Sequence, residues 1–167
     1  MKFKFKKTPY FIAEAGVNHE NSIHLAEKII KQAANGGASA VKFQTYKAEL
    51  LASKNSPAYW DTKKVKIKSQ YKLFKKFDKF NVNHYKKLKK ICDHYKVDFL
   101  STPFDNESAQ FLNKLVKYFK IASADITNRP LMDQILSFNK PIIFSTGASN
   151  MKEINDAYRY IKYKNSK

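Results

Sequence analysis

The stretch Ala40–Thr45 (AVKFQT) decides the fold expected for this chain. Alternation along an extended strand places Lys42 and Gln44 on one face and the apolar residues between them on the other. Two glycines at positions 36 and 37 precede the stretch, and an amphipathic segment precedes the glycines. This order is typical of a strand in an α/β unit, so Lys42 and Gln44 are predicted to point into a polar interior or a site.

A second lysine stands in the same kind of strand further along the chain. The stretch Phe119–Ser123 (FKIAS) carries Lys120 between apolar residues. Two strands that each deliver an inward lysine predict an anion held between them. The residues alone leave a second interpretation open, in which both lysines are solvated side chains on edge strands.

Strand-like and helix-like segments alternate along the whole chain. Strands are expected at 11–15, 40–45, 98–102 and 118–123, and residues 141–147 are expected to form a fifth strand and its turn. Helices are expected at 22–35, 70–77 and 83–95, from Asp105 or Asn106 through Leu115 and Val116, from Asn128, and after the Asn150 capping box. Repetition of this kind predicts a parallel sheet with right-handed crossovers.

Polar residues at the ends of these strands refine the expected fold. In a βα barrel the strand ends form the active face. An open doubly wound sheet also binds ligands there, but no glycine-rich dinucleotide fingerprint follows the first strand. A full eight-unit barrel needs about 250 residues. The 167 residues therefore predict an α/β fold of the TIM (β/α)8 barrel type that is incomplete, with about five βα units.

The chain is strongly basic, with a formal net charge of +18. Such a charge permits binding to nucleic acid or to an acidic surface. Almost all of it is lysine, because only Arg129 and Arg159 are arginines, and many lysines fall at helical spacing within residues 63–96. Arginine is the better reader of phosphates and bases, so solvated helix faces are the favoured interpretation. Nucleic acid is not expected as a partner, and a basic anion-binding module stays the alternative.

Nothing in the chain predicts a membrane or a secretory route. No apolar run approaches the ~18 residues of a transmembrane helix. Residues 1–7 lack the apolar core and cleavage site of a secretory signal. Cys92 is the single cysteine and falls among helical apolar positions, which predicts a core residue. A reducing, cytoplasmic setting fits these features.

Five stretches at the strand ends together resemble the N-acetylneuraminate (sialic acid) synthase family. They occur in the order of that family and are Ile12–His19, Ala40–Thr45, Asp98–Phe104, Phe119–Ser123 and Phe144–Gly147. The family also includes legionaminic and pseudaminic acid synthases and a spore-coat polysaccharide branch. Its members are TIM barrels that condense phosphoenolpyruvate with an N-acetylated hexosamine such as N-acetylmannosamine. The resemblance therefore implies a transferase that forms a carbon–carbon bond and yields a nonulosonic (sialic-type) acid and phosphate.

The resemblance also implies individual roles. The residues expected to bind phosphoenolpyruvate carry ammonium or hydroxyl groups: Lys42, Thr102, Lys120, Ser123 and Ser145. Those expected to contact the amino sugar are Glu14, Gln44, Asn18, His19 and Asp125, and those expected to take part in catalysis are Glu14, Lys42 and Gln44. Asp125 stands where many members have a glutamate, and Ala124 replaces a glycine before it.

A divalent metal, manganese or magnesium, is implied by the same resemblance, because the family uses one to polarise the aldehyde. Its two histidines in the family lie on later strands, beyond residue 167. The histidines at 24, 84 and 94 fall on expected helices. No metal ligand is therefore assigned to this chain.

The domain expected for residues 1–167 is the N-terminal part of a synthase barrel. The last strands and a C-terminal antifreeze-like domain are expected to be absent. A truncated gene, one half of a split gene and an inactive remnant all stay open as explanations. The intact family is expected to be homodimeric, and a second chain that completes the barrel is the other expected partner.

Overall fold

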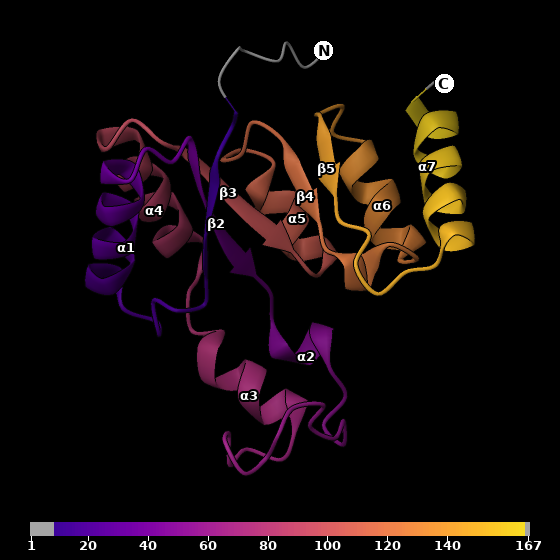
Figure 1. Cartoon of the computed structure of the whole chain (residues 1–167), viewed down its shortest axis with the longest axis horizontal. Coiled ribbons are helices and arrows are strands. Elements are labelled where there is room, and N and C mark those ends of the chain that lie inside the picture. Colours follow the sequence, from indigo (N-terminus) through magenta and orange to yellow (C-terminus); the bar gives the residue numbers. More distant parts are fainter. Residues whose placement is uncertain (1–8, 166–167) are drawn as a thin grey trace.

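Strands and helices alternate along the chain in the expected order (Figure 1). The structure is a computed structural model that describes residues 9–165, so the segment 1–7 discussed above lies outside the described residues. The strands are β1 (Ile12–Gly16), β2 (Ala40–Thr45), β3 (Asp98–Pro103), β4 (Phe119–Ile121) and β5 (Ile142–Phe144). The helices are α1 (Ile23–Asn35), α2 (Ala48–Leu51), α3 (Gln70–Phe77), α4 (Val82–His94), α5 (Asn106–Leu112), α6 (Arg129–Leu136) and α7 (Met151–Asn165), with a short 3₁₀ turn η1 (Ser123–Asp125).

The paired strands all run parallel, which confirms the α/β fold class. β2 lies between β1 and β3, β4 pairs with β5, and β4 packs beside β3. The register places Lys42 opposite Glu14 of β1, and Gln44 opposite Thr102 of β3. Because parallel strands end on the same side of a sheet, these polar residues approach one another at the carboxyl ends of the strands.

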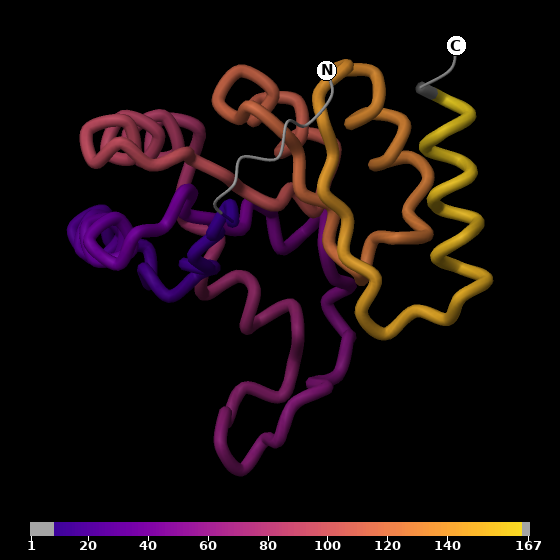
Figure 2. Tube along the Cα trace, turned by 45° about the horizontal axis from the view of Figure 1, so that its top comes forward, coloured from indigo at the N-terminus to yellow at the C-terminus, as the bar shows by residue number. Residues whose placement is uncertain are grey.

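Apolar residues on the two faces of the strands form two separate cores. The helices form an arc around the outside of the strands (Figure 2). Phe43, Phe99 and Phe119 are at most 2% exposed and belong to the large core that the strands share with these helices. A smaller cluster around Leu100 and Tyr118 occupies the other face of the strands. Apolar residues thus bury both faces of the strands, as in a barrel wall.

Helix starts follow the caps that the sequence predicts. Ser22 accepts a hydrogen bond from the Leu25 amide at 3.2 Å at the start of α1. Asn150 and Glu153 exchange the two hydrogen bonds of a capping box, at 2.8 and 3.0 Å, before α7. Each cap satisfies amides that the first helical turn leaves without a partner.

Some element bounds differ from the sequence-based expectation. The helix predicted to run through Leu115 and Val116 ends at Leu112, because the chain turns there toward β4. Lys140 donates to the Val116 carbonyl at 2.7 Å and helps to fix this turn. The fourth strand ends at Ile121 rather than at 123, where η1 begins. Helix α2 was not predicted.

Residues 46–80, called the arm from here on, extend beyond the carboxyl ends of the strands and contain α2 and α3 (Figure 1). Side chains hold the two ends of the arm together. The Asp78 carboxylate accepts a hydrogen bond from the Ala48 amide at 3.1 Å, and Lys47 Nζ donates to the Asp78 and Phe80 carbonyls at 3.2 and 3.3 Å. Asp105, before α5, accepts from the Lys47 amide at 3.2 Å. The base of the arm is therefore fixed to the strand ends.

Among the described residues 9–165, no helix combines the length and the apolar character that crossing a membrane requires.

Candidate functional site

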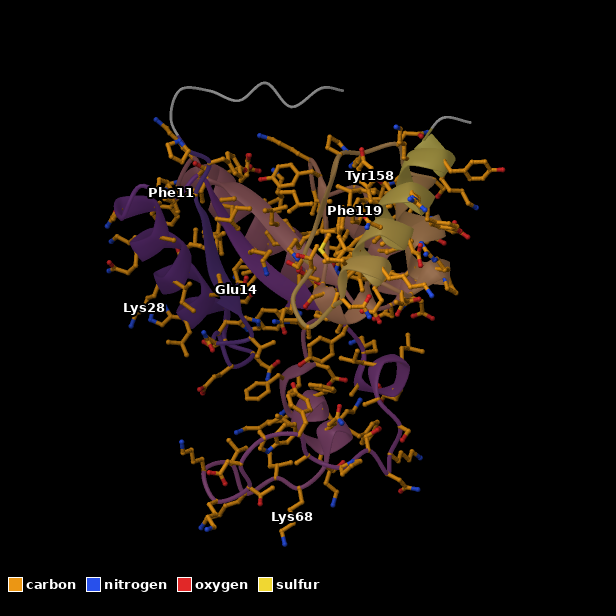
Figure 3. The ribbon with its side chains drawn as sticks, turned by 45° about the vertical axis from the view of Figure 1, so that its right-hand side comes forward. Phe11, Glu14, Lys28, Lys68, Phe119 and Tyr158 are labelled. Atoms are coloured by element: carbon orange, nitrogen blue, oxygen red, sulfur yellow. The ribbon has the colours of Figure 1, made fainter. Side chains whose placement is uncertain are left out.

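The first part of the candidate site is an ion pair between neighbouring strands. Glu14 on β1 and Lys42 on β2 lie opposite each other, and the Glu14 carboxylate contacts Lys42 Nζ. The Lys42 side chain is 15% exposed, whereas that of Glu14 is 50% exposed. A carboxylate at the end of an apolar strand is costly unless it has a partner, and Lys42 is that partner here. Figure 3 shows Glu14 near the carboxyl ends of the strands.

Gly16 leaves open space beside this pair. A Cβ atom at Gly16 would lie 3.3 Å from Glu14 Oε1 and 3.8 Å from Gln44 Nε2, so these two side chains flank the same point. The residue also has a positive φ of 53°, which favours glycine. Thr102 is 3% exposed and lies opposite Gln44 in the β2–β3 register. Gln44 and Thr102 therefore extend the polar group that begins at Glu14 and Lys42.

Lys120 brings a second ammonium group to this region from β4. Its Nζ donates to the Ile121 carbonyl at 2.7 Å. Burial lowers the pKa of Lys120, the positive charge of Lys42 lowers it further, and the negative charge of Glu14 opposes the shift. These electrostatic effects reach Lys120 from both members of the ion pair, so the two inward lysines share one environment. Repulsion between them is relieved when an anion binds to both.

The ends of β4 and β5 place two hydroxyl groups near Lys120. The Ser145 amide donates to the Ile121 carbonyl at 3.1 Å, so Ser145 and Lys120 meet at the same carbonyl oxygen. A Cβ at Gly147 would lie 3.5 Å from Ser123 Oγ, which places the loop after β5 against the turn after β4. Ser123 and Ser145 thus lie at the ends of adjacent strands.

Asp125 lies two residues after Ser123, in η1. Its Oδ1 accepts a hydrogen bond from Asn128 Nδ2 at 3.0 Å, while its buried Oδ2 has no hydrogen-bond partner among residues 9–165. Burial raises the pKa of the Asp125 carboxyl, and the bond from Asn128 opposes that shift. The role expected for Asp125 in sugar binding stays a prediction.

His19 lies in the loop after β1 and packs against aromatic rings. Its ring is 1% exposed, stacks on Phe80 at 4.4 Å between ring centroids, and lies 5.8 Å from Phe43. Phe43 is on the helix-covered side of β2, opposite Lys42 and Gln44. Burial lowers the pKa of His19 to about 4. The structure therefore gives His19 a packing position beneath the arm and does not bring it together with the inward lysines.

Asn18 is exposed in the same first loop, and its amide donates to the Ala15 carbonyl at 3.0 Å. Its expected contact with the amino sugar stays a prediction.

Two glycines were not predicted as parts of the site. Gly16 is the last residue of β1, Gly147 lies in the loop after β5, and each lies beside a candidate side chain. A glycine at the end of a strand, or in the turn after it, next to polar residues is the signal that marks such positions. Both leave room for a ligand where a larger residue would contact Glu14 or Ser123.

The implied divalent metal does not fit the residues described here. Within residues 9–165, no group of three or more His, Cys, Asp or Glu side chains could hold a metal ion. Glu14 is engaged by Lys42, and Asp125 accepts from Asn128. No step of the chemistry is therefore derived through a metal.

The arrangement suits a small, densely charged anion. Lys42 and Lys120 supply two ammonium groups from separate strands, and Thr102, Ser123 and Ser145 supply hydroxyl donors at neighbouring strand ends. Charge-assisted hydrogen bonds in a partly dry site are stronger than the same bonds in water. Glu14 can accept a proton or orient a hydroxyl once an anion competes for Lys42.

A comparison with solved structures defines the fold class. A truncated form of 3-deoxy-D-arabino-heptulosonate 7-phosphate synthase from Thermotoga maritima superposes with a TM-score of 0.65 at 12% identity, over 93% of this chain and 47% of that one. At this identity the likeness shows the fold alone: the parallel βα arrangement of a barrel-type synthase.

The family follows from closer matches: the chain belongs to the NeuB family, whose model matches residues 29–167. N,N'-diacetyllegionaminic acid synthase from Campylobacter jejuni is 43% identical over 91% of this chain and 46% of its own length. The sialic acid synthetase of Leptospira borgpetersenii, solved in complex with citrate, has a TM-score of 0.79 at 31% identity, over 93% of this chain and 50% of that one. The spore coat polysaccharide biosynthesis protein SpsE of Bacillus subtilis is 35% identical over 94% of this chain and 42% of its own length.

These matches confirm the family inferred from the five strand-end stretches. The chain spans less than half the length of the curated relatives named above.

Proposed function

We propose that this chain binds phosphoenolpyruvate between Lys42 and Lys120 and contributes that site to a synthase of sialic-type acids. The observation that carries the proposal is the shared environment of the two lysines, which come from β2 and β4 and both act electrostatically with Glu14. Family membership supports it, because the relatives named above include synthases of legionaminic and sialic acid.

The proposed reaction joins the methylene carbon of phosphoenolpyruvate to the aldehyde carbon of an N-acetylated hexosamine. Lys42 and Lys120 hold the phosphate and the carboxylate, and hydroxyl groups of Ser123 and Ser145 complete the anion site. Glu14 and Gln44 flank the space left by Gly16, where they orient the sugar beside the methylene carbon. Water then adds to the former enol carbon, and phosphate leaves.

The described strands form two sheets, β1–β2–β3 and β4–β5, which pack side by side through β3 and β4, so β1 and β5 lie at the two outer edges without a strand partner there. We propose that the remaining barrel strands of the family complete the fold at these edges, and that the sugar-specific contacts and the metal ligands come from that part. A second polypeptide or further residues of the same one can supply them.

The test is thermal unfolding of the 167-residue chain with and without millimolar phosphoenolpyruvate. Binding to the folded state alone raises the unfolding midpoint. We expect a rise for the native chain that is lost in Lys42→Ala and in Lys120→Ala. Lys117→Ala is the matched control: this lysine is exposed, pairs with Asp98 at 2.5 Å before β4 begins, and lies at the opposite ends of the strands.

The control should unfold at a lower temperature yet keep the full shift from phosphoenolpyruvate. An equal rise of the unfolding midpoint with phosphoenolpyruvate in the native chain and all three variants would contradict the proposed site. No shift in the native chain would count against the function itself.

A basic anion-binding module is the second candidate, and the net charge of +18 favours it. It predicts binding to nucleic acid that weakens steeply as salt rises. Retained binding of DNA after substitution of both Lys42 and Lys120, together with no response to phosphoenolpyruvate, would favour this alternative.

A further inference from the structure

The arm carries an uneven share of the positive charge of the molecule. Residues 46–80 hold ten lysines against three acidic residues. Two of those acids, Glu49 and Asp78, already face Lys75 near the base of the arm, at 2.5 and 3.4 Å. Most of the uncompensated charge therefore lies toward the tip.

The tip, residues 53–69, contains five lysines and one acidic residue, Asp61. The lysines at the tip are all exposed and are Lys54, Lys63, Lys64, Lys66 and Lys68. Asp61 Oδ1 accepts from the Lys63 amide at 2.9 Å. Figure 3 shows Lys68 at the far end of the arm, beyond the strand ends where Glu14 lies.

The tip has a defined shape, so its charges have defined positions. Trp60 Nε1 donates to the Ile67 carbonyl at 3.0 Å and closes the loop from inside. Pro57 and Ser69 form an antiparallel bridge, and Gln70 Nε2 donates to the Pro57 carbonyl at 2.8 Å. With the base pinned by Asp78 and Asp105, the arm holds its lysines in front of the site rather than letting them spread through solvent.

We infer that the arm is an electrostatic guide that collects small anions in front of the strand ends and raises their rate of entry to Lys42 and Lys120. This inference rests on the proposed function. A surface of one charge sign beside a site raises the local concentration of an oppositely charged ligand and speeds its association by tenfold or more in strong cases. The anion that the arm guides is phosphoenolpyruvate, because this is the ligand of the proposed site.

The test compares two variants with the same change in net charge. The arm variant carries Lys63→Gln, Lys64→Gln, Lys66→Gln and Lys68→Gln. The control variant carries Lys28→Gln, Lys31→Gln, Lys86→Gln and Lys90→Gln, all exposed residues on the outer helices α1 and α4. Neither set includes a residue assigned to the site, and a thermal scan of each variant without ligand confirms that it is folded.

The association rate and the dissociation constant of phosphoenolpyruvate are measured for each protein at about 20 mM and about 300 mM salt, where screening lengths differ several-fold. We expect the arm variant to associate about threefold or more slowly than the native chain at low salt, and equally fast at high salt. The association rate of the control variant at low salt should differ much less from that of the native chain. The dissociation rate should stay nearly constant throughout.

Equal slowing in both variants would overturn the guide, because net charge alone would then explain the rate. Unchanged rates in both would overturn it as well, and the proposed anion site would stand. No binding by the native chain at either salt concentration would overturn the site and the guide together, and that result is distinct from the other two.

Discussion

At the scale of single residues, Lys120 is the group whose charge is most sensitive to its surroundings. Burial and the nearby Lys42 lower its pKa, so it loses its proton at a lower pH than an ordinary lysine. An anion favours the charged form of a lysine, so phosphoenolpyruvate binding should take up protons where Lys120 is partly neutral.

We expect the affinity for phosphoenolpyruvate to fall with rising pH already below the range in which an ordinary lysine titrates, because the pKa of Lys120 is lowered. Calorimetry in buffers of different ionisation enthalpy measures the proton uptake directly. Lys120→Arg is the matched variant, because a guanidinium stays charged throughout this range. Persistence of the same pH dependence in Lys120→Arg would assign it to another group.

His19 predicts a second pH effect, on stability. Burial lowers its pKa to about 4 in the folded chain, whereas an unfolded histidine titrates near 6.5. Between these values the unfolded state binds more protons, so the free energy of unfolding must fall as pH falls through this window. The full loss attributable to His19 is at most about 3 kcal/mol, from its shift to about 4.

His19→Phe keeps an aromatic ring on Phe80 and removes the titrating group. Denaturant unfolding at several pH values should therefore show a flatter dependence for His19→Phe than for the native chain. His24→Ala, at an exposed position on α1, should leave the native slope unchanged. A native slope retained in His19→Phe would contradict the assignment.

At the scale of elements, the base of the arm depends on Asp105. Its carboxylate caps α5 through the Ser108 amide at 2.7 Å, accepts from Ser108 Oγ at 2.8 Å, and accepts from the Lys47 amide at 3.2 Å. It is 7% exposed, so each of these donors loses its partner in a largely dry place when the carboxylate is removed.

We expect Asp105→Ala to lower the free energy of unfolding by about 2–4 kcal/mol. It should also speed hydrogen exchange at the Lys47 amide. Asp156→Ala, at an exposed position on α7, is the control and should hardly change the free energy of unfolding. Fast exchange confined to α5, with the arm unaffected, would show that Asp105 acts as a helix cap only.

The sequence predicted those elements whose signals are local. Alternation around Lys42 and Lys120 predicted that their strand neighbours are buried on the opposite face, and the burial of those neighbours confirms this alternation. The Asn150 capping box predicted where α7 begins. Helix α2 was missed because it is a four-residue turn whose first amide is bonded by Asp78, thirty positions away in the chain.

The candidate site also contains residues that local sequence predicted and one whose position depends on distant contacts. Polar strand ends and the family resemblance pointed to Glu14 and Gln44, and the structure places both around Gly16. The position of His19 could not be predicted from the sequence, because it depends on Phe80 at the base of the arm, which is distant from His19 in the chain. The position of His19 therefore depends on contacts between distant segments, which a local sequence pattern does not predict.

At the scale of the whole molecule, the two sheets pack through β3 and β4, and β1 and β5 lie at the outer edges with no strand partner there among the described residues. Phe11 beside β1 is 62% exposed, and all three residues of β5 are only partly buried. Exposed strand edges favour association with other strands. These exposed edges support the proposal that the remaining strands of a barrel pair with β1 and β5 in parallel register.

We expect the C-terminal half of the Campylobacter jejuni relative, produced separately and mixed with this chain, to form a one-to-one complex and to raise its unfolding midpoint. Analytical ultracentrifugation and thermal scans measure both. The N-terminal half of that relative is the control, and it should neither form the one-to-one complex nor raise the unfolding midpoint of this chain. Equal binding of both halves would indicate nonspecific edge association.

The central claim is that two ammonium groups hold the two ends of one small anion. Calorimetric titration of the native chain with phosphoenolpyruvate, inorganic phosphate and pyruvate tests it most directly. Phosphoenolpyruvate should bind at least about tenfold more tightly than either fragment, because it alone reaches both lysines, and Lys42→Ala or Lys120→Ala should abolish that advantage. Phosphoenolpyruvate that binds no more tightly than inorganic phosphate would contradict the claim.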